Sequence, residues 1–265
     1  MAANKTRTAD ADLLLELALQ AGEIGLKYFK SDNKVWYKEG NSPVSQADKE
    51  IDDYLRLNFT KARPDYGWLS EETEDHTDRL NCERVIIADP IDGTRGFIDG
   101  RDEWCISIGI VENGRPIEAI LHCPALKRTF LASKGHGLEI IGSPFEQKDR
   151  SSKPLVTGSK KLIDTIQNLP DAPFAVMEFI PSLAYRLALV AVGELDGAFA
   201  RGGASEWDIA AADLILEEVG CLLTDDKKDA LSYNRANVQV PALIASHNNR
   251  YEEIFTLAKQ AGFLH

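Results

Sequence analysis

A short apolar run that ends in paired acids constrains this chain more than any other feature. Residues Val85 to Ala88 are continuously apolar, which is typical of a strand buried on both faces, and Asp89 ends the run. The turn that follows carries Asp92 three residues later, then Gly93, which permits a tight turn. Because α/β proteins usually place their ligands at the carboxyl ends of buried strands, we expect a polar site here.

The remaining periodicity predicts helices first, then strands, then an alternation of the two. Apolar residues at three- and four-residue steps predict a helix over 10–29, and a capping pattern predicts another from Ser45, after a loop or hairpin over 34–44. Short strands are expected at 85–88, 105–112, 117–123, 128–132, 138–141, 174–179, 195–200, 221–224 and 242–246. Helices are expected at 181–192, 206–219 and 251–261. The pattern predicts a layered α/β fold, with an α+β half over 1–153 and an α/β half over 154–265 that together form one compact unit.

Composition narrows the class of protein. The 30 Lys and Arg against 42 Asp and Glu give a net charge of −12, which argues against direct nucleic-acid binding and against an anionic membrane surface. The four cysteines form no CxxC pair, and no apolar run approaches the roughly 20 residues that span a bilayer. We therefore expect a cytoplasmic protein that uses no membrane and reaches anionic substrates only with bound cations.

Four acidic stretches of the chain are candidate sites for such cations, and each has a simpler interpretation. Asp89, Asp92 and the carbonyl of Ile91 are oxygen donors of the kind that Mg²⁺ prefers, but aspartates also cap ordinary turns. Glu71 stands in an acidic segment that fits an exposed loop. Two further aspartates complete the helix-capping pattern Ser-x-x-Asp, which explains them without a ligand; they are Asp48 and Asp208.

Taken together, four motifs resemble the inositol monophosphatase family of Mg²⁺-dependent, lithium-sensitive phosphatases over nearly the whole chain. In order they are Gly40-Asn41-Ser42-Pro43-Val44-Ser45-Gln46-Ala47-Asp48, Leu69-Ser70-Glu71-Glu72, Asp89-Pro90-Ile91-Asp92-Gly93-Thr94 and Trp207-Asp208-Ile209-Ala210-Ala211-Ala212. The resemblance implies a phosphoric monoester hydrolase with an αβαβα sandwich fold, usually a homodimer. It also implies two Mg²⁺ ions and a third, weaker one.

The resemblance assigns a role to each matched residue. Ligands of the first ion would be Glu71, Asp89 and the carbonyl of Ile91, and ligands of the second would be Asp89, Asp92 and Asp208. The catalytic group would be Asp48 and Thr94, which orient a water, together with Glu71. Phosphate and substrate contacts would come from Gly93, Thr94, Lys38 and Asp208. Two ions carry +4 against about four carboxylates, so the loaded site would approach neutrality before a phosphate arrives.

The sequence says less about the substrate. Inositol monophosphatases typically carry an Asn at the position of Gly96 and bisphosphate nucleotidases a Glu, while Arg95 is similar to histidinol phosphatases. Pro181 and Ala184 depart from the nucleotidase pattern. We predict a small phosphorylated metabolite, with inositol monophosphate first and a 3'(2'),5'-bisphosphate nucleotide or histidinol phosphate as alternatives.

Two questions stay open from the sequence. Arg186 and Glu206 are candidates for contacts with the organic part of the substrate, although the stem of Arg186 also suits an apolar face. A polyol needs several hydrogen-bonding groups, whereas a nucleobase needs a flat apolar or aromatic wall. A function of another class is a weakly catalytic interaction protein associated with RNA or transcription, against which the intact acidic set argues.

Overall fold

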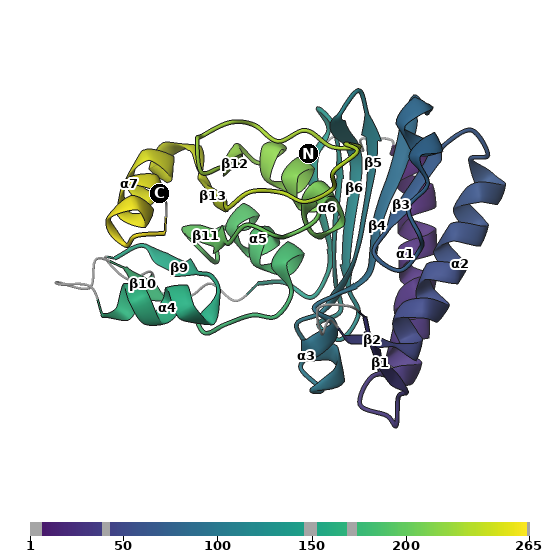
Figure 1. Ribbon diagram of the computed structural model, residues 1–265, viewed down its shortest axis with the longest axis horizontal. Helices are drawn as coiled ribbons and strands as arrows, with labels where there is room; N and C mark the ends of the chain where they lie inside the picture. The colour runs from purple at the N-terminus through teal and green to yellow at the C-terminus, as the bar shows by residue number, and fades with distance from the viewer. Residues whose placement is uncertain (1–6, 39–42, 146–152, 169–173, 264–265) are drawn as a thin grey trace.

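Layers of helix and sheet alternate through the molecule. The computed structural model describes residues 7–38, 43–145, 153–168 and 174–263. In Figure 1 the layers run from α1 (Ala9–Tyr28) and α2 (Gln46–Ala62) on one side to α4 (Lys160–Gln167) and α7 (Tyr251–Gln260) on the other. Two sheets and a central pair of helices lie between them. The layered α/β sandwich predicted from the sequence is confirmed.

The first two helices form where the periodicity predicts them. The α1 helix buries the stripe that includes Leu14, Leu17 and Ala21, and its N-cap residue Thr8 accepts a hydrogen bond from Ala11 N. The α2 helix begins directly after Ser45, as the capping pattern predicts. Both apolar stripes pack on one face of the first sheet, and this packing, more than propensity, holds the helices in place.

The first sheet has six strands in sequence order. They are β3 (Gly67–Ser70), β4 (Arg84–Asp92), β5 (Cys105–Glu112), β6 (Arg115–Cys123), β7 (Arg128–Ser133) and β8 (Gly137–Gly142). β3 and β4 are parallel, and the other neighbours are antiparallel. The predicted strand at 85–88 is longer than expected, because β4 continues past Asp89 to Asp92 through an irregularity in its pairing with β5. β3 is missing from the prediction, which interprets that segment as a loop.

The second half of the chain builds the other layers. The central helices are α5 (Leu183–Ala191) and α6 (Glu206–Glu217). The second sheet has the order β10-β9-β11-β13-β12, with bounds β9 (Leu155–Thr157), β10 (Ala175–Val176), β11 (Gly197–Ala200), β12 (Cys221–Asp225) and β13 (Leu243–His247). Only two residues of the strand predicted at 174–179 are strand, and β9 and α4 are not predicted at all. One core cluster joins both sheets through α5 and α6.

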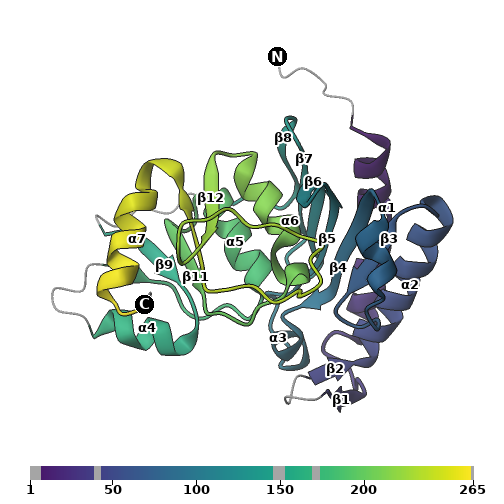
Figure 2. The ribbon, with the colours of Figure 1, turned by 45° about the horizontal axis from the view of Figure 1, so that its top comes forward.

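Small elements surround the edge of the first sheet where β4 ends. The hairpin of β1 (Val35–Tyr37) and β2 (Pro43–Ser45) confirms the turn predicted there, although its motif residues Gly40, Asn41 and Ser42 lie outside the described residues. The short helix α3 (Thr94–Ile98) follows β4, and Figures 1 and 2 both place it beside that hairpin. The remaining short helices are η2 (Thr77–Asn81) and η3 (Asn248–Arg250). The division at residue 153 stays a prediction.

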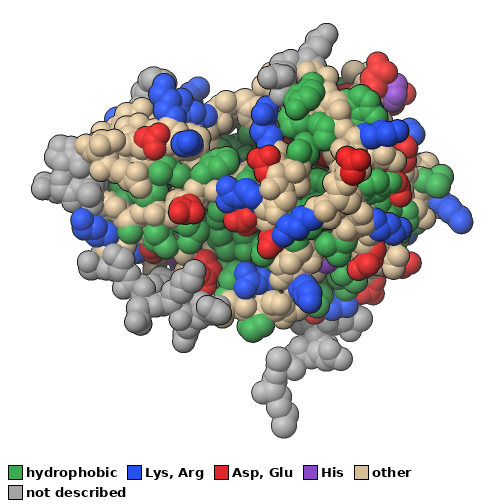
Figure 3. Space-filling model, turned by 90° about the horizontal axis from the view of Figure 1, so that it is seen from below, with side chains coloured by type: hydrophobic (Ala, Val, Ile, Leu, Met, Phe, Trp, Pro, Cys, Tyr) green, Lys and Arg blue, Asp and Glu red, His purple; other side chains and the backbone are tan. Residues whose placement is uncertain are grey.

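On the face shown in Figure 3, basic and acidic side chains are interspersed and do not separate into patches of one sign. Within the described part of the chain, none of the helices combines the length and the apolar character needed to cross a bilayer.

His122 on β6 packs closely against Gly22 of α1. Its side chain is 8% exposed, and its Nδ1 lies 2.8 Å from Thr129 Oγ1. A Cβ added to Gly22 of α1 would lie 2.4 Å from His122 Nε2, so the helix can pack here only because residue 22 has no side chain. Burial lowers the pKa of His122 to about 4.

We expect the substitution His122→Gln to flatten the loss of stability at acid pH. The folded protein holds His122 neutral down to about pH 4, whereas the unfolded chain protonates it near pH 6.5. Between those values the unfolded state binds more protons, so the free energy of unfolding falls as the pH falls, by about 3 kcal/mol in all. Urea unfolding of both proteins from pH 8 to pH 4 measures the free energy of unfolding, and the difference between the two proteins at pH 8 serves as the baseline. Parallel curves for the two proteins would contradict the assignment.

Candidate active site

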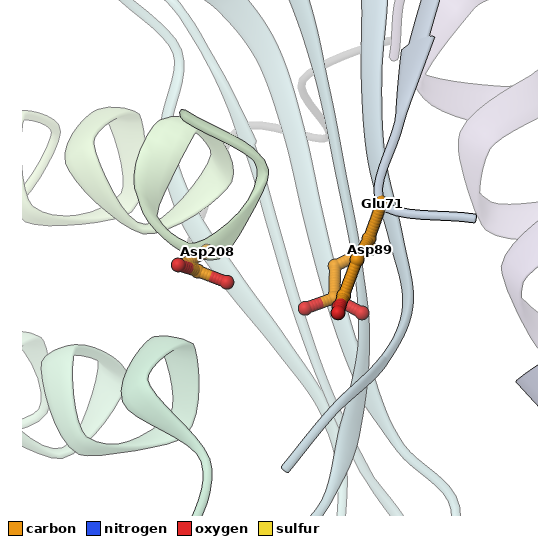
Figure 4. Close-up of side chains that lie close together, drawn as sticks. All are labelled: Glu71, Asp89 and Asp208. Carbon is orange, nitrogen blue, oxygen red and sulfur yellow. The ribbon is translucent and has the colours of Figure 1, made fainter. Parts of the chain in front are cut away.

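Three carboxylates from three elements converge at the edge of the first sheet. The pairing of the parallel strands β3 and β4 ends with Ser70 opposite Ala88. The next residues, Glu71 and Asp89, therefore lie side by side at this edge. Asp208 lies in the first turn of α6, across from that edge. One carboxylate oxygen of each residue lies within 4.8 Å of the other two. Figure 4 shows Asp208 reaching from α6 toward the other two side chains.

The electrostatics of this cluster suit a divalent cation. Burial, and then the negative charges of Glu71, Asp92, Asp208 and Asp48, raise the pKa of Asp89 well above its usual value. Burial and the charge of Asp92 likewise raise the pKa of Asp208 to about 8. Close carboxylates at these distances repel unless a cation lies between them, and an all-oxygen donor set is the kind that Mg²⁺ prefers. The residues present therefore fit Mg²⁺.

Two of the predicted site residues are also helix caps. Asp48 Oδ2 accepts from Ser45 N at 2.7 Å, and Asp208 Oδ2 accepts from Ser205 N at 2.7 Å. The other oxygen of Asp48 accepts from Thr94 Oγ1 at 3.1 Å. Burial raises the pKa of Asp48 to about 6, against the lowering effect of its bonds to Ser45 and Thr94. The capping and the site interpretations are therefore compatible, because one carboxylate has two oxygens.

The structure turns Asp92 toward the N-terminus of α5. Its Oδ2 accepts from Ser182 Oγ at 2.5 Å and from Ala184 N at 2.6 Å, and its Oδ1 accepts from Leu183 N at 3.2 Å. Asp92 lines the same cavity as the cluster, but it is not one of the three residues whose oxygens lie within 4.8 Å of one another. Its predicted role as a ligand of the second ion stays a prediction.

Gly93 lets the chain turn directly after Asp92. Its φ of +96° is in the left-handed region, where a side chain is disfavoured, and an added Cβ would lie 3.1 Å from Ser182 N. Thr94 Oγ1 also lies 3.0 Å from the carbonyl oxygen of Ile91, so its one proton is shared between that oxygen and Asp48. These contacts hold the turn that carries the predicted phosphate-binding residues.

Lys38 follows the β1 strand and reaches the acidic cluster from outside. Its Nζ lies 3.2 Å from Glu71 Oε1 and 2.6 Å from Glu72 Oε1. Burial raises the pKa of Glu72 to about 7, although the ammonium of Lys38 lowers it. Lys38 thus offsets negative charge beside Glu71, while its predicted contact with phosphate stays a prediction.

A cavity of about 430 Å³ opens over the cluster. Its outer part is lined by residues that the sequence prediction does not name as contacts: Pro43, Arg95, Gly96, Asp99, Arg101, Phe179 and Pro181. Arg101 donates to the carbonyl oxygen of Phe179 at 2.9 Å, and the ring of Phe179 lies 5.6 Å from the guanidinium carbon of Arg186. No local sequence signal joins residues 95–101 to 179–181; the fold alone brings them together.

Gly96 and Pro181, two of the three departures noted in the sequence, touch each other. A Cβ on Gly96 would lie 2.6 Å from Pro181 Cγ, so any larger residue would push α3 away from the segment before α5. A polar side chain such as Asn or Glu, which the family resemblance led us to expect at this position, therefore does not fit here without a shift. The cavity wall at this point is the Pro181 ring in place of a polar group.

Besides Lys38, two further predicted substrate contacts are not among the residues that line the cavity. Glu206 is fully buried, and its carboxylate accepts from Asn234 N at 2.6 Å, Arg235 N at 3.1 Å and Arg235 Nε at 3.0 Å. It does not line the cavity, because its side chain faces the 234–235 loop. Arg186 lies behind the cavity wall, where its Nε donates to Ser182 O at 3.2 Å and its charge faces Asp92 and Asp208. Neither side chain is among the residues that line the cavity.

Comparison with known proteins agrees with this geometry. A sequence model of the inositol monophosphatase family matches residues 8–262. The 3'(2'),5'-bisphosphate nucleotidase CysQ of Aggregatibacter actinomycetemcomitans is 28% identical, with 84% of this chain and 86% of the relative covered. The histidinol-phosphatase of Chlorobaculum parvum is 32% identical (80% and 84% covered), and the inositol-1-monophosphatase of Mesorhizobium japonicum is 29% identical (83% and 86% covered).

Solved structures share the fold. The IMPase TM1415 of Thermotoga maritima superposes with a TM-score of 0.82 at 24% identity, covering 97% of this chain and 99% of that one. An IMPase/NADP phosphatase complexed with Mg²⁺ and phosphate gives a TM-score of 0.78 at 20% identity, with 93% of each chain covered.

These observations define a phosphoric monoester hydrolase built on a layered α/β sandwich. The chain belongs to the inositol monophosphatase family. The family resemblance seen in the sequence is thereby confirmed, while the relatives differ in the ester that each is named for.

Proposed function

We propose that the protein is a Mg²⁺-dependent phosphomonoesterase in which Glu71, Asp89 and Asp208 are metal ligands. The observation that carries the proposal is that one oxygen of each residue lies within 4.8 Å of the other two. One of the three, the buried carboxyl of Asp89, has a pKa well above its usual value. Bound Mg²⁺ supplies the positive charge that offsets these acids, polarises the phosphate and activates an attacking water. The neighbour complexed with Mg²⁺ and phosphate supports the choice of ion.

The chain's own residues then orient the reaction. The hydroxyl proton of Thr94 is held by Asp48 Oδ1 and the carbonyl of Ile91, which leaves the Thr94 oxygen free to accept a proton from a water. A water held in that way approaches phosphorus from one direction. The backbone amides of Gly93 and Thr94 and the ammonium of Lys38 are the proposed donors to phosphate oxygens. Asp92, Asp208 and the Ile91 carbonyl complete the proposed set around the cations.

For the substrate, we propose a 3'(2'),5'-bisphosphate nucleotide. The outer cavity carries an aromatic ring at Phe179 and apolar surface at Pro43 and Pro181, with Arg95 and Arg101 beside them. A nucleobase stacks on such a wall, and arginines are suited to a second phosphate. A polyol would leave hydroxyls against Phe179 and Pro181 without partners.

Inositol monophosphate, the preference from the sequence, is the second candidate. The charged groups of Arg95, Asp99 and Arg101 on the cavity wall can bond to ring hydroxyls, and the relative from Mesorhizobium japonicum supports it. Phosphate release from the nucleotide, inositol 1-phosphate and histidinol phosphate, with Mg²⁺ and with EDTA, tests the proposal. The nucleotide should give the highest kcat/KM. No turnover of any ester with Mg²⁺ would instead favour the interaction-protein alternative.

The substitution Phe179→Ala should separate the two substrates. Phe179 is 38% exposed and faces the cavity, so loss of its ring removes base stacking worth about 1–3 kcal/mol. We expect kcat/KM for the nucleotide to fall about tenfold or more and that for inositol 1-phosphate to change less than about threefold. Phe179→Tyr, which keeps the ring, is the control. An equal fall for both esters would remove the stacking argument.

A further inference from the structure

Asp52 lies one turn after Asp48 on α2 and faces the segment that carries Glu71. Its side chain is 4% exposed. Its Oδ1 accepts a hydrogen bond from Ser70 Oγ, and its Oδ2 accepts one from Thr73 Oγ1. One buried carboxylate is thus bonded to both residues that flank Glu71 and Glu72.

The two hydroxyls are held from a second side as well. Glu72 N donates to Ser70 Oγ at 3.4 Å, and Trp68 Nε1 donates to Thr73 Oγ1 at 3.4 Å. Each hydroxyl therefore accepts from one group while it donates to Asp52. The backbone of Glu71 is fixed separately, because its N–H donates to Ala88 O of β4 at 3.3 Å.

This arrangement works against a strong local tendency. Glu71, Glu72, Glu74 and Asp75 are close in sequence, and like charges drive such a segment outward into water, where they are better solvated. Glu71 nevertheless directs its carboxylate inward to Asp89 and Asp208. A bond at each end of the four-residue turn from Ser70 to Thr73 opposes the outward movement.

We propose that Asp52 is a positioning residue that holds this turn so that Glu71 can bind the cation. The inference rests on the proposed function, since it assumes that Glu71 is a ligand. Asp52 is not itself a ligand, because both of its oxygens accept bonds from hydroxyls and it is absent from the cluster of three. Residues that orient metal ligands typically alter metal affinity or activity by about 10–100-fold when replaced.

Calorimetric titration with Mg²⁺, without substrate, tests the proposal directly. For Asp52→Ala we expect the dissociation constant for Mg²⁺ to rise about tenfold or more. Activity should then need correspondingly more Mg²⁺, with the KM for the ester little changed and kcat largely recovered at saturating Mg²⁺. Asp52→Asn removes the charge, but its amide can accept from one hydroxyl through the oxygen and donate to the other through the nitrogen, so we expect a change of less than about threefold.

The pair of variants separates positioning from simple charge. Equal weakening in Asp52→Ala and Asp52→Asn would mean that the negative charge attracts the cation, and would overturn the proposal. If Asp52→Ala does not fold, Thr73→Val removes one of the two bonds at nearly constant volume and should weaken Mg²⁺ binding in the same direction. An unchanged Mg²⁺ affinity in folded Thr73→Val and Asp52→Ala would also overturn it.

A buried acid outside the site supplies the matched control. Asp213 on α6 is equally buried and accepts from Tyr233 Oη at 2.9 Å, with Arg115 3.1 Å away. We expect Asp213→Ala to lower the melting temperature while its Mg²⁺ affinity stays that of the wild type. If the wild-type protein binds no Mg²⁺, the proposed function itself is refuted. If the wild-type protein and Asp52→Ala bind Mg²⁺ with the same affinity, only the role of Asp52 is refuted.

Discussion

The substitution Asp89→Asn is expected to reduce phosphatase activity by about a thousandfold or more without destabilising the metal-free protein. The carboxylate of Asp89 is at the centre of the cluster, and loss of its charge removes several kcal/mol of stabilisation of the reacting phosphate through the cation. Asn can still accept the bond that Ile91 N donates to Asp89 Oδ1 at 2.9 Å. Phosphate release at millimolar Mg²⁺ and melting in EDTA measure the two effects.

The stability part of this prediction has a definite sign. Because the folded protein raises the pKa of Asp89, ionisation of this carboxyl opposes folding at neutral pH, and the amide removes that cost. The variant should melt at or above the wild-type temperature in EDTA, with the difference shrinking as the pH falls toward the carboxyl's usual pKa. Added Mg²⁺ should raise the wild-type melting temperature more than the variant's.

A buried acid serves as the control for this substitution too. In Asp213 the pKa is likewise raised by burial, to about 6, but the residue lies outside the cavity. Asp213→Asn should keep activity within a few-fold of the wild type. Near-wild-type turnover in folded Asp89→Asn would refute the ligand assignment. A wild-type melting temperature that does not change with millimolar Mg²⁺ would refute the cation site.

For Glu206→Ala the expected result is a large loss of stability with little change in KM. The fully buried carboxylate of Glu206 accepts hydrogen bonds from the backbone N–H groups of Asn234 and Arg235 and from the guanidinium of Arg235. Removing one partner of a buried charged group typically costs about 3–5 kcal/mol, and each kcal/mol lowers the melting temperature of a chain of this size by about 2 °C. Thermal melts and steady-state kinetics on the same preparations measure both quantities.

Glu217, on the same helix, is the control for Glu206. Its side chain is 44% exposed and pairs with Arg115 in contact with water, so Glu217→Ala should cost about 1 kcal/mol or less. If Glu206→Ala melts like the wild type but has a much higher KM, that result would support the substrate contact predicted from the sequence.

Long, strongly patterned elements could be predicted from the sequence. The strand at 105–112 forms with those bounds as β5, and α1 and α6 begin within one residue of their predicted starts. Short elements could not: β9 has three residues, too few to show a period. β3 has four residues next to the acidic segment, and its strand character depends on parallel pairing with β4, which no local signal encodes.

The identity of the site's acids was readable because their chemistry is local. Asp89 follows directly on the apolar run of β4, and Asp208 completes a helix cap, so both positions follow from neighbouring residues. The direction of a side chain is a different matter. Asp92 bonds to the start of α5 and Glu206 to a loop about thirty residues away, and both choices depend on elements that arrive from distant parts of the chain.

The residues alone were enough to establish the layered α/β class, the family and the set of acids, since apolar periodicity and short motifs encode local geometry and donor chemistry. Folding settled which of those acids meet, what forms the cavity wall and how Glu71 is held. Glu71 directly follows β3, Asp89 lies in β4 and Asp208 in α6, and Gly96 meets Pro181 across 85 positions of sequence. Contacts of this kind are decided by packing between layers, where close-packed side chains from distant segments leave few alternatives.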